Sequence, residues 1–236
     1  MAEIEVYYNR LTPYYTFMYR DWENSLQQQA EVLNRVIHEY FGQSIHTILD
    51  AACGIGTQCL GLARQGYQLT ASDISPAEVE RARAEAQKRG LSIHFDTADM
   101  CRLWQHYQHH FDLVIACDNA IPHLLSDEQI LEAFKQFYLC SAPSGGCILS
   151  VRDYATLTHS ASQIYPRNVH ESGEGKLILF DHWKFDGDYY DMTTYVVEDK
   201  GQPETITHVI QGGRYYCVSI NRLEELLIQA GFKRVF

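Results

Sequence analysis

The stretch that decides the fold is Ile48-Leu49-Asp50-Ala51-Ala52-Cys53-Gly54-Ile55-Gly56-Thr57. An apolar run ends in an acid and is followed by a glycine-rich turn, a pattern typical of a β-strand that leads into a helix. The glycines at 54 and 56 let the backbone turn sharply and let a ligand approach it closely. Asp73 follows Gly56 by about 17 residues, at the end of a second apolar run, and this spacing is typical of an acid that binds ribose hydroxyls. The stretch therefore predicts a nucleoside cofactor at a strand end.

The same stretch indicates which nucleoside is bound. The fingerprint reads G-x-G-x-x-C, with Cys59 in the place of the third glycine of a dinucleotide-binding turn. Asp50 lies at the expected strand tip, where a carboxylate repels a pyrophosphate and favours a cofactor with a positive end. The ammonium and sulfonium of S-adenosyl-L-methionine (SAM) fit that requirement. An NAD-dependent oxidoreductase remains an alternative, as does a glycine turn that serves only strand-to-helix packing.

Residues 50–57 resemble motif I of the class I SAM-dependent methyltransferases, and Asp73 resembles the ribose-binding acid of that class. The resemblance implies SAM as cofactor and S-adenosyl-L-homocysteine as product. Ligands of such folds bind beyond the carboxyl ends of the strands. The expected strand tips then supply these candidate cofactor contacts: Asp50, Ala52, Cys53, Gly54, Gly56, Asp73, Ile74, Ala98, Asp99, Met100, Cys117 and Asp118. Asp99 has the alternative role of a helix N-cap.

Strand and helix patterns alternate through the first two thirds of the chain. Strands are expected at 47–50, 68–72, 92–97, 112–117 and 147–151, and helices follow the first, second and fourth of them. Two of these helices open with capping boxes, Ser75-Pro-Ala-Glu78 and Ser126-Asp-Glu-Gln129. This order predicts an α/β, Rossmann-like, doubly wound and mostly parallel sheet. We assign residues 1–152 to this SAM-binding core, including an aromatic-rich N-terminal helical arm.

The pattern changes after Arg152. Residues 154–175 are polar and predict a long loop, which suggests a lid. Antiparallel strands are expected at 176–185, 189–198, 204–211 and 214–219, the first two joined by the hairpin turn Asp186-Gly187. Residues 153–219 are thus predicted to be an insertion over the active site, and residues 220–236 the last core helix and strand. The class usually has a final antiparallel strand that residues 232–236 do not supply, so either the chain is truncated or that position is filled differently.

A narrower resemblance concerns the acceptor side. Residues 112–124 and Val151-Arg152-Asp153-Tyr154 resemble the glycine/sarcosine N-methyltransferase group, although Asp118 and Pro122 depart from its pattern. The resemblance implies that Arg152 pairs with a substrate carboxylate beside Asn119, and that His123 lies nearby as a candidate base. It also implies that Tyr8 and Tyr15 contact the cofactor and that Tyr195 and the Tyr215-Tyr216 pair, with Tyr216 preferred, wall the substrate. The alternatives are a surface arginine and a histidine satisfied by backbone.

Together these patterns predict an enzyme that transfers a methyl group from SAM to a small molecule. The acceptor expected from Arg152 is the nitrogen of an amino acid or another carboxylate-bearing amine. O- or C-methylation of another metabolite, a non-catalytic SAM-binding protein and an NAD-dependent oxidoreductase remain alternatives.

Composition limits the partners. The chain has 236 residues and a net charge of −11, which disfavours a nucleic-acid partner. No apolar stretch reaches membrane-spanning length, and the seven cysteines lack paired spacing, so we expect free thiols, a cytoplasmic protein and no membrane partner. A homo-oligomer is possible. The group Cys101, His106, His109 and His110 fits no zinc spacing, so we expect no metal.

Overall fold

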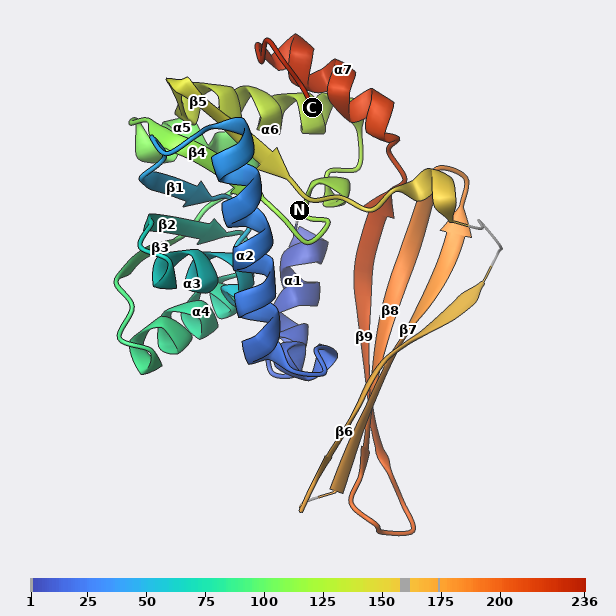
Figure 1. Cartoon of the computed structure of the whole chain (residues 1–236). Coiled ribbons are helices and arrows are strands. Elements are labelled where there is room, and N and C mark those ends of the chain that lie inside the picture. The colour runs from blue at the N-terminus through green and yellow to red at the C-terminus, as the bar shows by residue number, and fades with distance from the viewer. Residues whose placement is uncertain (1, 158–161, 174) are drawn as a thin grey trace.

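A parallel sheet forms the centre of the molecule. The computed structural model describes residues 2–157, 162–173 and 175–236 (Figure 1). The sheet has five strands in the order β3-β2-β1-β4-β5, and every neighbouring pair is parallel. Its strands are β1 (Thr47–Asp50), β2 (Gln68–Asp73), β3 (Ile93–Thr97), β4 (Phe111–Ala116) and β5 (Ser141–Leu149). The carboxyl ends of all five strands therefore meet at one edge, which confirms the Rossmann-like prediction.

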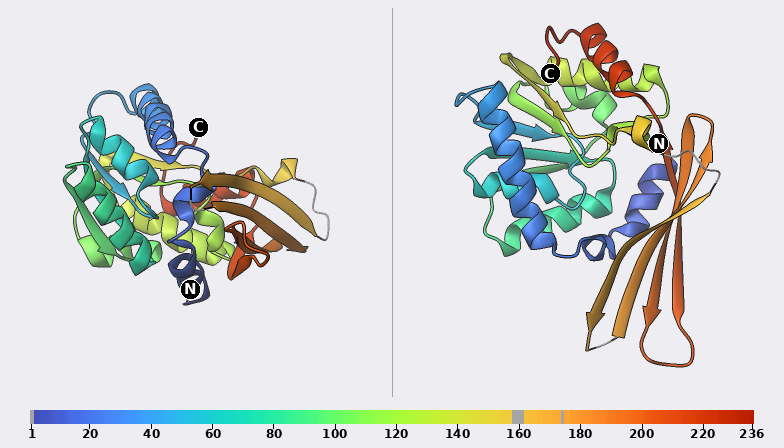
Figure 2. Two further views of the ribbon diagram at one scale, coloured as in Figure 1. Left: turned by 90° about the horizontal axis from the view of Figure 1, so that it is seen from below. Right: turned by 45° about the vertical axis from the view of Figure 1, so that its right-hand side comes forward.

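Helices cover both faces of this sheet (Figures 1 and 2). On one face pack α2 (Trp22–Tyr40), α3 (Thr57–Arg64) and α4 (Pro76–Lys88). On the other pack α5 (Leu103–Tyr107), α6 (Asp127–Cys140) and α7 (Ile220–Ala230). Successive residues of β1 serve the two layers, since Ile48 is buried in the first and Leu49 in the second. Two-sided burial explains why the central strand β4 is nearly all apolar in sequence.

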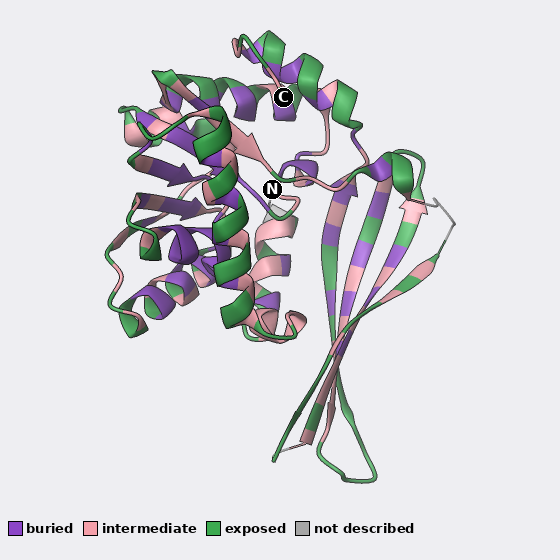
Figure 3. Ribbon diagram, in the orientation of Figure 1, coloured by how far each residue is buried: buried purple, intermediate pink, exposed green. Residues whose placement is uncertain are grey.

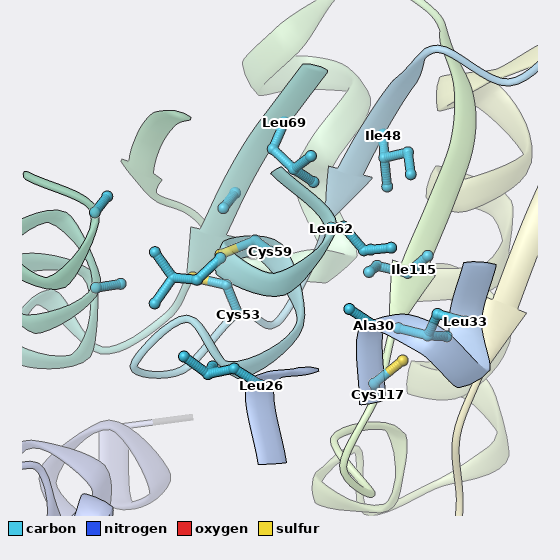
Figure 4. Packing of buried hydrophobic residues seen from close by; sticks show 14 of the residues in the cluster. Leu26, Ala30, Leu33, Ile48, Cys53, Cys59, Leu62, Leu69, Ile115 and Cys117 are labelled. Carbon is cyan, nitrogen blue, oxygen red and sulfur yellow. The ribbon is translucent and has the colours of Figure 1, made fainter. Parts of the chain in front are cut away.

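Close packing beside the glycine-rich turn holds the first layer together. Leu26, Ala30 and Leu33 of α2 belong to the same buried cluster as Cys53 of the turn and Cys59 of α3, which lie side by side (Figure 4). Gly61 is required at the α2–α3 crossing, because a Cβ there would lie 2.5 Å from the carbonyl oxygen of Leu26. The turn therefore rests on a closely packed base.

A second, antiparallel sheet lies beside the core and extends beyond it (Figures 1 and 2). Its order is β6-β7-β8-β9, with β6 (Gln163–Ser172), β7 (Gly175–Asp186), β8 (Tyr189–Asp199) and β9 (Ile206–Tyr216). Helix α1 (Ala2–Leu11) packs against β9 and α4, between the sheet and the core. Figure 3 shows that burial in this sheet concentrates at the end next to the core. Of the described helices, none is long and apolar enough to span a bilayer.

Several predicted boundaries are wrong. The loop expected over 154–175 contains strand β6 between Gln163 and Ser172, while positions 158–161 and 174 of that prediction lie outside the described residues. Strand β5 begins at Ser141 rather than Cys147, and the two expected last strands form one strand, β9, with an irregularity in its pairing to β8 between Met192 and Thr194. Residues 231–236, after α7, do not form the expected strand.

Candidate active site

The glycine-rich turn is fixed from both neighbouring strands. The amide of Ala51 donates to the Ile115 carbonyl of β4, and the amide of Cys53 donates to the Ser72 carbonyl of β2. Gly56 caps α3 with φ of 99°, a left-handed conformation that favours glycine. The two backbone bonds fix the turn to β4 and β2 at the carboxyl ends of the strands.

Asp73 clamps the same turn at the end of β2. One carboxylate oxygen, Oδ2, accepts from the Gly54 amide at 2.9 Å, and the other, Oδ1, accepts from the Ser75 amide at 2.9 Å. Each oxygen keeps a second lone pair, so the carboxylate can still accept ligand hydroxyls.

A cavity lies over these strand ends. Most of the predicted cofactor contacts line it: Tyr8, Tyr15, Ala52, Cys53, Gly54, Asp73, Ile74, Ala98, Asp99, Met100, Cys117 and Asp118. Asp99 does so while accepting from the Cys101 amide at 2.9 Å, so it is an N-cap and a cavity residue at once. Sequence reasoning missed Ile4, Thr57, Gln58 and Glu78, which also line the cavity.

Asp50 and Gly56 do not line the cavity, which corrects their assignment as direct contacts. Asp50 is fully buried behind the turn, and neither carboxylate oxygen has a hydrogen bond of normal geometry within the described part of the chain. Burial is the main cause that raises its pKa to about 8, and the Ala52 amide offsets this in part. Gly56 faces Leu60 of α3 instead of the cavity.

Helix α1 roofs the cavity and is tied to the core beneath it. The Asn9 side-chain oxygen accepts from the Ser75 hydroxyl at 2.7 Å and from the Ala77 amide at 3.3 Å, at the start of α4. Thr12 donates to the Glu78 carboxylate at 2.8 Å. The aromatic arm thus reaches the cofactor cavity from the N-terminus, as predicted for Tyr8.

His123 lines the first cavity and is bonded there to Tyr8. Its Nδ1 lies 3.0 Å from the Arg214 carbonyl oxygen, which can only accept, so Nδ1 carries the proton. Its Nε2 then accepts from the Tyr8 hydroxyl at 2.7 Å. Burial lowers the pKa of His123 to about 4, so the ring is neutral at pH 7.

A second cavity adjoins the first and shares Tyr8, Tyr15 and Asp118 with it. Asn119 and Arg152 line it, from the neighbouring tips of β4 and β5, as predicted. Asn119 uses its side chain to join those tips, because its oxygen accepts from the Arg152 amide at 2.9 Å and its nitrogen donates to the Tyr154 hydroxyl at 2.8 Å.

Two arginines reach this second cavity, and they differ in charge balance. Arg167 of β6 pairs with the fully buried carboxylate of Asp181 at 2.5 Å. Arg152 donates to the Tyr190 hydroxyl at 3.0 Å and lies over the Trp183 ring at 4.5 Å, and it has no carboxylate partner among the residues that the structure describes. Arg152 is therefore a fixed positive charge without a counter-charge.

Tyr195 and Tyr216 line neither of these two cavities, so the structure does not bring them together with Arg152 and Asn119 there, and their role as substrate walls stays a prediction. Tyr195 stacks on Phe180, and Tyr216 donates to Asp127 at 3.1 Å and stacks on Tyr189. Tyr215, one residue away, lines the second cavity instead. Alternation along β8 and β9 is the signal that separates the two faces, because side chains of a strand point alternately to opposite sides.

The donor set fits SAM. Asp73 keeps free lone pairs for ribose hydroxyls, Asp99 offers an acceptor at the next strand tip, and Ile74 and Met100 supply apolar surface beside them. Tyr8, Tyr15 and Asp118 lie where this cavity meets the second one, and a carboxylate there suits a cationic group. Among the described residues, neither a lysine nor an arginine lines the cavity, and this disfavours a pyrophosphate.

Comparisons with known proteins agree with this geometry. Residues 48–145 match a protein family described as a methyltransferase domain. The chain is 26% identical over 144 residues to a glycine/sarcosine N-methyltransferase of Parasynechococcus marenigrum, which covers 61% of the chain and 50% of that relative. It is 32% identical over 119 residues to a ubiquinone biosynthesis O-methyltransferase of Rickettsia prowazekii, covering 50% of the chain and 45% of the relative. The chain thus spans about half the length of these relatives.

The fold also matches solved structures. SAM-bound CalS10, an amino pentose methyltransferase from Micromonospora echinaspora, superposes with a TM-score of 0.75 at 15% identity, covering 93% of this chain and 86% of that one. A SAM-dependent methyltransferase from Clostridium acetobutylicum superposes with a TM-score of 0.71 at 16% identity, covering 86% and 80%. Fold, cavity and sequence matches agree: residues 48–145 match a methyltransferase domain, and the chain has the fold of solved SAM-dependent methyltransferases, which indicates SAM as the cofactor.

Proposed function

We propose that this protein transfers a methyl group from SAM to the nitrogen of a small amine that carries a carboxylate, such as an amino acid. The observation that carries the proposal is the guanidinium of Arg152 in the cavity next to the cofactor cavity, which has no carboxylate partner among the described residues. A planar guanidinium with five donors is the preferred partner of a carboxylate. Arg167 offers no such site because Asp181 already neutralises it.

The chemistry asks mainly for orientation. SAM supplies a methyl group that its sulfonium already activates. Holding two reactants in line lowers the barrier by about 7–11 kcal/mol, so methyl transfer does not require a catalytic triad. In this proposal Arg152 holds the carboxylate, while the inward-facing Tyr215 and Met192 close the far side of the cavity.

Tyr8 orients the amine in this proposal. Because the Tyr8 hydroxyl donates its proton to His123, its oxygen is left as an acceptor at the junction of the two cavities. An amine N–H that donates to this oxygen would direct the nitrogen lone pair away from it. His123, with its pKa near 4, is too weak a base to keep an ammonium proton, so that proton is lost to water before the amine reacts. His123 thus acts as a positioning residue.

The acidic surface favours a small acceptor over a nucleic acid. The net charge is −11, and phosphate backbones need basic surface. We expect a cytoplasmic protein that acts on a free metabolite.

The test is a methylation assay with amino acids, amino sugars, neutral alcohols and tRNA, comparing wild type with Arg152→Lys. Lysine keeps the charge but loses the planar fork, so we expect turnover of the preferred amino acid to fall at least about tenfold while binding of S-adenosyl-L-homocysteine is unchanged. Arg35→Lys, the same change on the exposed side of α2, is the control and should behave as wild type. A preferred acceptor without a carboxylate, or a fully active Arg152→Lys, would refute the carboxylate role.

A further inference from the structure

Glu78 is a buried carboxyl group in the cofactor cavity that the sequence assigned only to a helix cap. It is fully buried in the first turn of α4 and lines the cavity. Only half of the expected capping box forms: the Glu78 amide donates to the Ser75 hydroxyl at 3.1 Å, but the Ser75 amide donates to Asp73 rather than to Glu78. The Glu78 carboxyl group is therefore not used as a cap.

One oxygen of Glu78 has a partner and the other does not. Oε1 accepts from Thr12 at 2.8 Å, whereas Oε2 makes no hydrogen bond within the described part of the chain. Leaving a buried carboxyl oxygen unpaired is unfavourable, and native proteins rarely do so without a functional reason.

The free oxygen lies beside the ribose-binding acid. The Gly54 amide donates to Asp73, and a Cβ added to Gly54 would lie 3.0 Å from Glu78 Oε2. The two carboxyl groups therefore flank one glycine at the cavity wall. A ribose carries two adjacent hydroxyls, and a single carboxylate need not serve both.

The geometry points to Glu78 as a second ribose-binding group, which pairs with one hydroxyl of the cofactor while Asp73 binds the other. This inference rests on the proposed function only in requiring the adenosyl cofactor. Burial and the neighbouring Asp73 raise the pKa of Glu78 well above its usual range. A shift in this direction favours the protonated form of Glu78, which opposes placing two negative charges beside one ribose.

A purely structural role predicts different behaviour. Thr12 would lose little without Glu78, because its hydroxyl also lies 2.7 Å from the Tyr8 carbonyl oxygen, which can accept the proton instead. Glu78→Met therefore leaves no new unpaired donor and fills a similar volume. We expect the ligand-free variant to melt at the wild-type temperature or above it, since it loses a buried carboxyl group that lacked a partner.

The experiment measures dissociation constants by calorimetry for wild type and Glu78→Met. The ligands are S-adenosyl-L-homocysteine, 5′-methylthioadenosine, and the 2′-deoxy and 3′-deoxy forms of 5′-methylthioadenosine. We expect the first two to bind the variant about three- to tenfold more weakly, as for the loss of one hydrogen bond. One of the two deoxy forms, lacking the hydroxyl that Glu78 binds, should bind both proteins equally.

Thr12→Val is the matched control, because it removes the contact with the arm and keeps the Glu78 carboxyl group. The inference fails if Thr12→Val reproduces the Glu78→Met effect, or if both deoxy forms lose as much affinity as the parent. Weaker binding of S-adenosyl-L-homocysteine with unchanged 5′-methylthioadenosine would place Glu78 on the ammonium group and also overturn the inference. If no adenosyl ligand binds to wild type, the cofactor assignment and this inference both fail. If wild type binds these ligands as expected but methylates no carboxylate-bearing amine, only the proposed function fails.

Discussion

Several polar side chains that line the two cavities also accept hydrogen bonds from backbone amides. Asp73 accepts from two amides of the turn region, and Asn119 joins the tips of β4 and β5. Asp118 and Asn119 have φ angles of 52° and 66°, a left-handed conformation that is strained for residues other than glycine. Strain of this kind persists where surrounding bonds enforce it, and it is common at functional sites.

His123 makes the stability of the folded chain depend on pH. Its pKa is about 4 in the folded protein against an ordinary value of 6.5. The unfolded chain therefore binds this proton more tightly, so the contribution is complete above pH 6.5 and is lost as pH falls toward 4. The loss amounts to at most about 3 kcal/mol. Chemical denaturation of wild type and His123→Gln between pH 7 and pH 4 measures it.

The expected result is a shallower fall in the free energy of unfolding for His123→Gln, because glutamine can accept from Tyr8 and donate to Arg214 without titrating. His38→Gln, on the exposed side of α2, should keep the wild-type profile. Parallel curves for wild type and His123→Gln would show that His123 is not held neutral by burial.

The sequence predicted which residues lie near the site. It predicted which way their side chains point only where the same strand-end pattern recurs along the chain. The strand tips placed Asp73, Asp99 and Arg152 correctly at the cavities, since all parallel strands end at one edge. The sequence could not show that Tyr215 rather than Tyr216 faces the second cavity, because the direction of each side chain of β9 depends on its pairing with β8. The free carboxyl group of Glu78 was not predictable, because its alternative partner Thr12 lies far away in sequence.

At the scale of elements, α1 joins three parts of the molecule through consecutive residues. Tyr7 bonds to Thr194 of the antiparallel sheet at 2.9 Å, Tyr8 to His123 beside β4, and Asn9 to Ser75 at the start of α4. Both Ile4 and Tyr8 line the cofactor cavity. A ligand in that cavity therefore contacts the helix that bridges the core and the second sheet.

We expect the amides of α1 (Ala2–Leu11) to exchange more slowly once S-adenosyl-L-homocysteine is bound, because local opening of α1 would then break ligand contacts too. Hydrogen exchange with and without the ligand measures this. Asn9→Ala should speed α1 exchange without ligand by removing its bond to α4. Residues 177–185 of β7, which lie away from the cofactor cavity, provide an internal reference and should change little. Equal protection of α1 in both states would show that the helix does not close over the cofactor.

The core elements were predictable because each is marked by local signals, namely apolar strands, caps and glycine stops. Strand β6 was not, because it lies at an edge, pairs only with β7 and is largely exposed and polar. Its β structure depends on that partner rather than on an alternating pattern of its own. The loop predicted for residues 154–175 forms a strand at 163–172. Helix α1 lines the cofactor cavity through Ile4 and Tyr8.

At the scale of the molecule, the two sheets contribute to different cavities. The carboxyl edge of the parallel sheet supplies the cofactor cavity, and the inner face of the antiparallel sheet closes the second cavity through Arg167, Met192 and Tyr215. The outer face of that sheet, with Tyr195 and Phe180, contributes to neither. The second cavity therefore lies where the two sheets meet along α1.

Because Tyr8, Tyr15 and Asp118 wall both cavities, ligands in the two cavities should stabilise each other. We expect the preferred amino acid to bind at least about fivefold more tightly to protein saturated with S-adenosyl-L-homocysteine than to free protein, a coupling of about 1 kcal/mol. Thermodynamic linkage requires the same factor when the order of addition is reversed, so calorimetry in both orders checks the result internally. Tyr8→Phe, which keeps the ring but removes the hydroxyl bonded to His123, should reduce the coupling while leaving each ligand able to bind alone. Independent binding in wild type would mean that the shared wall is rigid in both states, and that the second cavity is formed before the cofactor arrives.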